Sequence, residues 1–162
     1  GLVGNALVSD TGELAFDPRA GTFRIRTEGC SYFSGDPSEG VTLTKDISLK
    51  LNNQRISAAL LPLEGRSVER AKTFLLTLLG PTGMDETAFI AEGYFTTVNL
   101  KGKLYADTPE GVLYVRCKQA TLTALDTVGN PVVCINGVPS SEGMSFTLDG
   151  TISAVHFLLE RK

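Results

Sequence analysis

The chain has 162 residues, of which 42% are hydrophobic and 20% charged, and its formal net charge is -3. A chain of this length can bury roughly 70% of the surface that its unfolded form exposes, which is enough for one hydrophobic core. The composition is that of a globular domain and excludes a disordered tail and a coiled coil. The 15 basic and 18 acidic residues form no extended basic cluster, so nucleic acid is not expected as a partner.

The sequence contains no hydrophobic segment that approaches the ~18 to 20 residues needed to span a bilayer, and no signal peptide at its start. A membrane is therefore not expected as a partner. The chain begins at Gly1, and its only methionines are Met84 and Met144. We interpret it as a single domain over residues 1–162 that is excised from a longer polypeptide.

Three cysteines, Cys30, Cys117 and Cys134, are widely spaced and include no Cys-x-x-Cys pair, so no disulfide framework is indicated. One bridge with a free third thiol stays open. Cys117 and Cys134 lie in apolar segments typical of strands, which favours their interpretation as small buried side chains. The lack of a disulfide pattern favours the cytoplasm, while a targeting signal in a preceding segment would allow secretion.

Apolar and polar side chains alternate along most of the chain, as they do in strands with one buried face. Turn residues such as Gly, Pro, Asp and Asn separate these segments at intervals of roughly 8 to 12 residues, which is typical of sandwiches and barrels. Only residues 66–72 are expected to form a helical turn. The sequence predicts an all-β fold, a two-sheet antiparallel sandwich similar to a jelly roll. The expected strands are residues 23–27, 47–51, 56–61, 73–79, 91–97, 112–117, 121–126, 132–135, 145–148 and 153–160.

The segment Thr73–Leu79 is apolar almost throughout. We expect either a central strand covered on both faces, or a strand with one face in the core and the other covered by the rest of a longer protein.

Catalytic chemistry is not indicated by the sequence. His156 is the single histidine, and the alternation of the last strand places it on the outward side. The signatures of a nucleophile elbow, a zinc site and a phosphate-binding loop are absent. We predict that the chain is not an enzyme by itself and expect no cofactor.

Calcium is the one metal that the sequence brings into consideration, because β-sandwiches can hold it between acidic loops. Asp10, Glu13 and Asp17 form such a cluster and are weak candidate ligands. The spacing is not that of an EF-hand, and turn formation explains Asp10 and Asp17 without a metal.

Carbohydrate binding would need aromatic rings that can stack on a sugar, and the chain has no tryptophan. Most of its tyrosines and phenylalanines have apolar neighbours that indicate a place in the core. Tyr32 and Tyr105 lie nearest to turn residues, so they are the candidate sugar-binding residues at an edge or rim of the sandwich.

Four motifs occur in a characteristic order. They are Ser9–Leu14 with Gly21–Thr27, then Ala58–Ser67, then Arg70–Gly80, and then Gly111-Val112 with Ala124–Gly129, before a closing pair of strands within Phe146–Leu159. Together they resemble the β-sandwich domain that follows the catalytic barrel in several glycoside hydrolases of the (β/α)8-barrel clan. The resemblance covers nearly the whole chain. Phe16 stands where that family usually has tryptophan, and Asp85-Glu86-Thr87 stands where it commonly has Asn-Thr-Gly.

The resemblance implies a noncatalytic C-terminal accessory domain of a bacterial glycoside hydrolase. Such a domain packs against the barrel of the same polypeptide and stabilises it, while the barrel carries both catalytic carboxylates. The alternative function is a carbohydrate-binding module for a soluble glycan or a glycan end. That alternative predicts a concave face or a rim where aromatic and polar groups converge.

Overall fold

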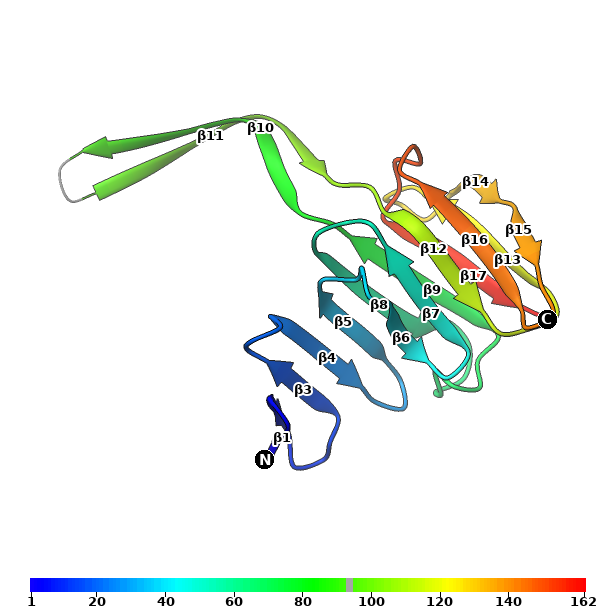
Figure 1. Cartoon of the computed structure of the whole chain (residues 1–162). Coiled ribbons are helices and arrows are strands. Elements are labelled where there is room, and N and C mark those ends of the chain that lie inside the picture. Colours follow the sequence, from blue (N-terminus) through cyan, green and yellow to red (C-terminus); the bar gives the residue numbers. More distant parts are fainter. Residues whose placement is uncertain (93–94) are drawn as a thin grey trace.

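The computed structural model describes residues 1–92 and 95–162, and it describes the side chains of all of these except Leu2, Val3 and residues 85–101. Two antiparallel sheets face each other as a sandwich, and a long two-stranded hairpin projects away from them (Figure 1). The predicted all-β, two-sheet antiparallel sandwich is confirmed. The described residues include no helix that is long and apolar enough to cross a membrane.

The larger sheet has ten strands in the order β1-β2-β3-β4-β5-β8-β9-β17-β13-β14. Its N-terminal half is a meander, in which each strand pairs with the next along the chain, and its other half receives strands from the C-terminal end. The strands are β1 (Leu2–Val3), β2 (Ala6–Val8), β3 (Leu14–Asp17), β4 (Thr22–Arg26), β5 (Ser31–Gly35), β8 (Ile56–Pro62), β9 (Thr73–Leu79), β13 (Ala120–Leu125), β14 (Pro131–Ile135) and β17 (His156–Arg161).

The smaller sheet has five strands in the order β15-β16-β12-β7-β6. They are β6 (Val41–Thr44), β7 (Ile47–Leu51), β12 (Glu110–Val115), β15 (Gly137–Pro139) and β16 (Met144–Asp149). The projecting hairpin consists of β10 (Thr82–Glu92) and β11 (Phe95–Ala106). We call it the arm. It leaves the larger sheet after β9 and returns to the smaller sheet at β12, so its base bridges one end of the sandwich (Figure 1).

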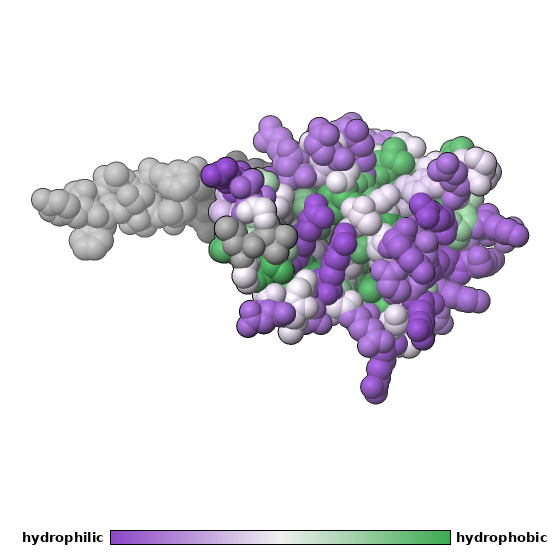
Figure 2. All heavy atoms as spheres, turned by 60° about the horizontal axis from the view of Figure 1, so that its bottom comes forward, coloured by the Kyte–Doolittle hydropathy of each residue, from purple (hydrophilic) through white to green (hydrophobic). Residues whose placement is uncertain are grey.

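The core lies between the two sheets and is built by the inward half of each alternating strand. In β9, for example, Phe74, Leu76 and Leu78 are fully buried while their neighbours are half-buried or exposed. Burial of one large apolar side chain contributes about 1.5–3 kcal/mol, so the two facing rows hold the sheets together. Figure 2 shows one side of the molecule, where hydrophobic atoms are visible between hydrophilic side chains. The largest fully buried side chains are Phe33, Phe74, Phe146, Phe157, Ile47, Leu49, Leu51, Leu60, Leu76, Leu78, Leu113 and Leu122.

Most of the expected strands are present, but the list omits β2, β3, β5, β6 and β15 and is wrong in the arm. Residues 73–79 and 47–51 are strands with the predicted bounds. The prediction of one strand over residues 91–97 is wrong, because β10 ends at Glu92 and β11 runs back antiparallel from Phe95. Residues 93–94 of that prediction lie outside the described residues.

The predicted helical turn at residues 66–72 is a single turn. The backbone N–H groups of Arg70 and Ala71 both donate to the carbonyl of Ser67, at 3.1 and 2.9 Å. Arg161 fixes this loop to β17, because its guanidinium donates to the carbonyls of Ala71 and Glu69 at 2.8 Å each. The loop therefore closes one end of the sandwich without a helix.

The three cysteines are free thiols in the structure. Cys30 and Cys117 are partly buried, and burial raises the pKa of both thiols. The prediction of a buried Cys134 is wrong, since this residue is exposed. Its apolar segment forms β14, the edge strand of the larger sheet, and the edge leaves four of that strand's five residues exposed.

Candidate functional site

The outward side of the larger sheet is uncharged over three rows of paired residues. We call these rows the outer face. Neighbouring residues within a row are register partners on adjacent strands, so their side chains point to the same side. The rows are Ile25, Tyr32, Ala59, Thr77, His156 and Leu125; Leu7, Phe16, Phe23, Ser34, Ser57 and Leu79; and Leu61, Leu75, Leu158, Thr123 and Cys134.

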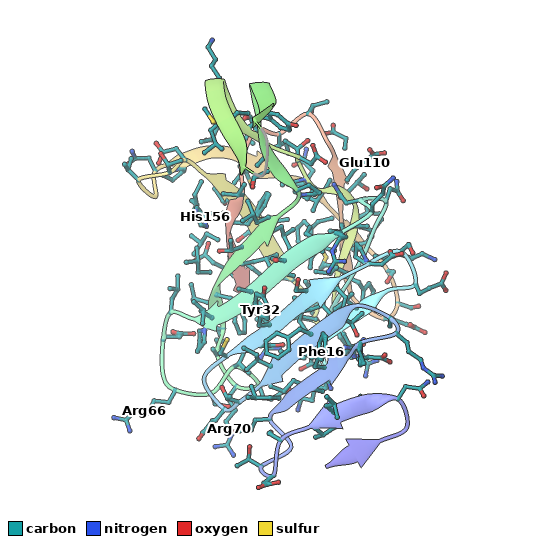
Figure 3. All side chains as sticks on the ribbon, turned by 90° about the vertical axis from the view of Figure 1, so that its left-hand side faces the viewer. Phe16, Tyr32, Arg66, Arg70, Glu110 and His156 are labelled. Carbon is teal, nitrogen blue, oxygen red and sulfur yellow. The ribbon has the colours of Figure 1, made fainter. Side chains whose placement is uncertain are left out.

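Several large apolar side chains on the outer face are exposed to solvent. Leu7 is 55% exposed, Phe16 43% and Leu61 39%. Figure 3 looks onto this sheet and labels Phe16, Tyr32 and His156 on it. None of the three rows contains Asp, Glu, Lys or Arg, so the outer face can lose its water without leaving a charge unpaired.

The outward side of the smaller sheet has a different character. Lys50, Thr147 and Asp149 are exposed there, and they alternate with buried leucine and phenylalanine. This is the ordinary pattern of a sheet with one face in water. Val112 and Val138 are also exposed on that side, at 39% and 61%, so the two outward sides differ in charge more than in apolar exposure.

The outer face bears on the expectation that β9 is covered on both faces. Phe74 and Leu76 point into the core, whereas Leu75 and Thr77 are half-buried on the outer face. The strand is therefore not covered on both sides within the described residues. His156 follows the same register, and its predicted outward position is confirmed.

Tyr32 lies within the outer face and not at an edge. Its strand β5 is paired on both sides, by β4 and β8. The phenol donates a hydrogen bond to the Oγ of Ser57 at 3.2 Å, and the ring meets that of Phe23 edge-to-face with centroids 6.2 Å apart. The expectation that Tyr32 projects from an edge or rim is therefore wrong.

Tyr105 occupies a different place, at the base of the arm. It lines a hollow of about 650 Å³ that also receives residues from β9, the 125–127 turn and the segment before β17. The structure thus separates the two candidate sugar-binding tyrosines. The lining residues are Leu79, Thr82, Leu104, Tyr105, Ala106, Thr108, Leu125, Asp126, Thr127, Ser153, Ala154, Val155 and His156.

The Tyr105 ring lies directly over the backbone of Gly83, its partner across the arm. A Cβ atom built on Gly83 would lie 2.6 Å from the phenol oxygen of Tyr105 and 2.8 Å from Cζ. Only glycine leaves room for the ring in this position. The residue is nevertheless 51% exposed, so one part of the ring is supported by backbone while another part meets solvent.

Polar groups on the walls of the hollow come from the turn after β13 and from the start of β17. The Nδ1 of His156 lies 3.0 Å from the Oγ1 of Thr77, and this contact fixes the imidazole against the outer face. Asp126 is the only acidic residue of the lining, and its carboxylate accepts hydrogen bonds from the N–H groups of Val128 and Asn130 at 2.9 and 2.8 Å. That carboxylate is therefore committed to shaping the turn.

The Asp126 carboxylate makes stability depend on pH. Hydrogen bonds, first from the backbone of Asn130, hold the pKa of this carboxyl below its ordinary value. Because the folded pKa is depressed, the stabilisation is present above the pKa of the unfolded chain and is lost as pH falls through the folded pKa. We expect the free energy of unfolding in urea to fall more between about pH 7 and about pH 3 for the unchanged chain than for Asp126→Ala. Equal losses would contradict this role of Asp126.

Two of the three weak calcium candidates, Asp17 and Glu13, accept local hydrogen bonds. Asp17 accepts from the N–H groups of Arg19 and Ala20 at 2.9 and 3.0 Å, and Glu13 accepts from the hydroxyl of Thr11 at 3.2 Å. Asp10 is exposed in the turn between β2 and β3. Among the residues whose side chains are described, no group of three or more His, Cys, Asp or Glu residues is placed to hold a metal ion.

Sequence reasoning identified Tyr105 but not the hollow around it. The hollow needs the base of the arm, and the long pairing of β10 with β11 carries no clear alternation in the sequence. Gly83 directly after Pro81-Thr82 was a usable signal, because glycine inside a strand often marks the close approach of another group. Comparison with known proteins found no matching family model, no matching curated protein and no matching solved structure.

Proposed function

We propose that this chain is a noncatalytic accessory domain of a bacterial glycoside hydrolase, and that its outer face packs against the catalytic barrel of the same polypeptide. The observation that carries the proposal is the uncharged outer face, with Leu7, Phe16 and Leu61 exposed, whereas the outward side of the smaller sheet carries the charged residues Lys50 and Asp149. Domain interfaces of this kind bury about 600–1,500 Å². The order of the four sequence motifs supports the choice of a barrel as the partner.

The arrangement of charges around the outer face agrees with such an interface. Interfaces commonly have an apolar centre and a charged rim. Arg66 and Arg70 belong to the loop at one end of the larger sheet (Figure 3). Glu160, the next outward residue of β17 after Leu158, lies toward the same end and accepts a hydrogen bond from Thr121 at 3.2 Å. The charged groups thus border the apolar rows and do not interrupt them.

The test is a paired substitution in the whole polypeptide that contains the chain. Leu75→Glu with Leu158→Glu places two carboxylates on the outer face, and Thr147→Glu places one on the outward side of the smaller sheet as the control. We expect the double variant to shorten the half-life of glycosidase activity at elevated temperature by roughly tenfold or more, and the control to change it little.

The chain alone supplies the second readout. It is expected to show no turnover of aryl glycosides, and circular dichroism of the double variant is expected to retain the strand signal. A polypeptide without a barrel, turnover by the chain alone, or an unchanged half-life in the double variant would each contradict the proposal.

A further inference from the structure

We propose that the hollow at the base of the arm binds a single pyranose ring of a neutral carbohydrate, with Tyr105 as the stacking surface. This is an activity beyond the accessory role. A volume of about 650 Å³ falls within the roughly 300–1,000 Å³ typical of small-molecule sites.

The first argument is the support of the Tyr105 ring. A stacking surface costs least to use when its ring is already held in place before the ligand arrives. The Tyr105 ring packs against the Gly83 backbone, and a side chain at position 83 would displace the ring. Because Tyr105 remains 51% exposed, the ring is both positioned and accessible, and these are the two properties that stacking on the C–H face of a sugar requires.

The second argument is the chemistry of the walls. Leu79, Leu125 and Val155 provide apolar contact, while Thr127 and Ser153 bring hydroxyl groups to the same hollow. A pyranose presents the same combination, with C–H groups on its faces and hydroxyl groups around its edge. Small-molecule sites commonly combine apolar walls with a few polar groups that fix the orientation of the ligand.

The third argument is charge. Among the residues whose side chains are described, the lining has no Lys or Arg, and its one carboxylate, Asp126, is held by the backbone of its own turn. The described lining thus offers neither a Lys or Arg to an anionic ligand such as a phosphate nor an uncommitted carboxylate to a cation. His156 stands at the wall with Nδ1 held by Thr77, so its imidazole is fixed in orientation. The hollow therefore favours an uncharged ligand that forms hydrogen bonds.

The test uses the chain of residues 1–162 and a panel of methyl glycosides, namely the α and β anomers of glucose, galactose, mannose, xylose and N-acetylglucosamine. Saturation-transfer NMR detects contact, and chemical-shift titration gives affinity. We expect at least one glycoside to bind with a dissociation constant on the order of 1 mM. Tyr105→Ala is expected to weaken that binding by roughly tenfold, and Tyr105→Phe to keep most of it.

Two further variants separate the site from the fold. Gly83→Ala is expected to weaken binding through displacement of the ring, although it leaves Tyr105 in the sequence. Tyr32→Ala, which removes the other candidate tyrosine, is expected to leave the affinity unchanged. Absence of binding across the panel, or binding that Tyr105→Ala and Gly83→Ala both leave intact, would overturn the proposal. The hollow shares Leu79, Leu125 and His156 with the outer face, so the titration uses the chain by itself, in which no barrel covers them.

Discussion

Replacing Phe157 with alanine is expected to lower the free energy of unfolding by about 3–5 kcal/mol. Phe157 is fully buried in β17, between Leu76 of β9 and Ala124 of β13. Its ring points from the larger sheet into the core, where the facing sheet leaves little freedom for neighbours to close a void. The loss therefore combines the transfer of the ring with the cavity that it leaves. Urea unfolding followed by circular dichroism measures it.

Leu158→Ala is the matched control, because this neighbour in the same strand points to the outer face. In the chain by itself we expect the free energy of unfolding to fall by about 1 kcal/mol, since Leu158 is only half-buried. In the whole polypeptide the loss is expected to rise, because the proposed barrel would cover this side chain. A Leu158→Ala loss equal to that of Phe157→Ala in the chain by itself would contradict the assignment of the two faces.

Alternation was enough to predict the two-sheet architecture and the side of β17 that faces outward. The period of two assigns Phe157 and Leu159 to one face and His156 and Leu158 to the other, and the structure has the same assignment. The segment 73–79 could not be resolved in this way, because its residues are apolar on both sides. Only the pairing with β8 and β17 shows which side lies in the core.

The candidate binding site was less predictable, because it depends on segments far apart in the chain. Tyr105 was chosen for its nearness to turn residues, and the same reasoning chose Tyr32, which belongs to a strand that is paired on both sides. Nearness to a turn does not distinguish an edge strand from a central one. What distinguishes the two tyrosines is the strand order, and strand order arises from long-range pairing that a local pattern does not contain.

Gly111→Ala is expected to destabilise the chain by about 3 kcal/mol or more. Gly111 lies in β12 between Leu51 and Leu148, with φ of 140°, a conformation that L residues rarely adopt. A Cβ atom here would lie 2.3 Å from the carbonyl oxygen of Lys50 and 2.7 Å from the Cα of Leu51. Both contacts are with backbone, so β7 and β12 would have to separate where Gly111 pairs with the last residue of β7. Urea unfolding gives the loss.

The control for Gly111 is Gly12→Ala. Gly12 also has a positive φ, of 74°, but a Cβ atom there would meet nothing within 4 Å. Its substitution should therefore cost only the conformational strain of about 1–2 kcal/mol. The difference between the two variants reports the clash with the β7 backbone together with the greater strain of a side chain at φ of 140°. If both variants lost the same free energy of unfolding, β7 would be able to move away without an energetic penalty. The close pairing of β7 with β12 would then not be what requires glycine at position 111.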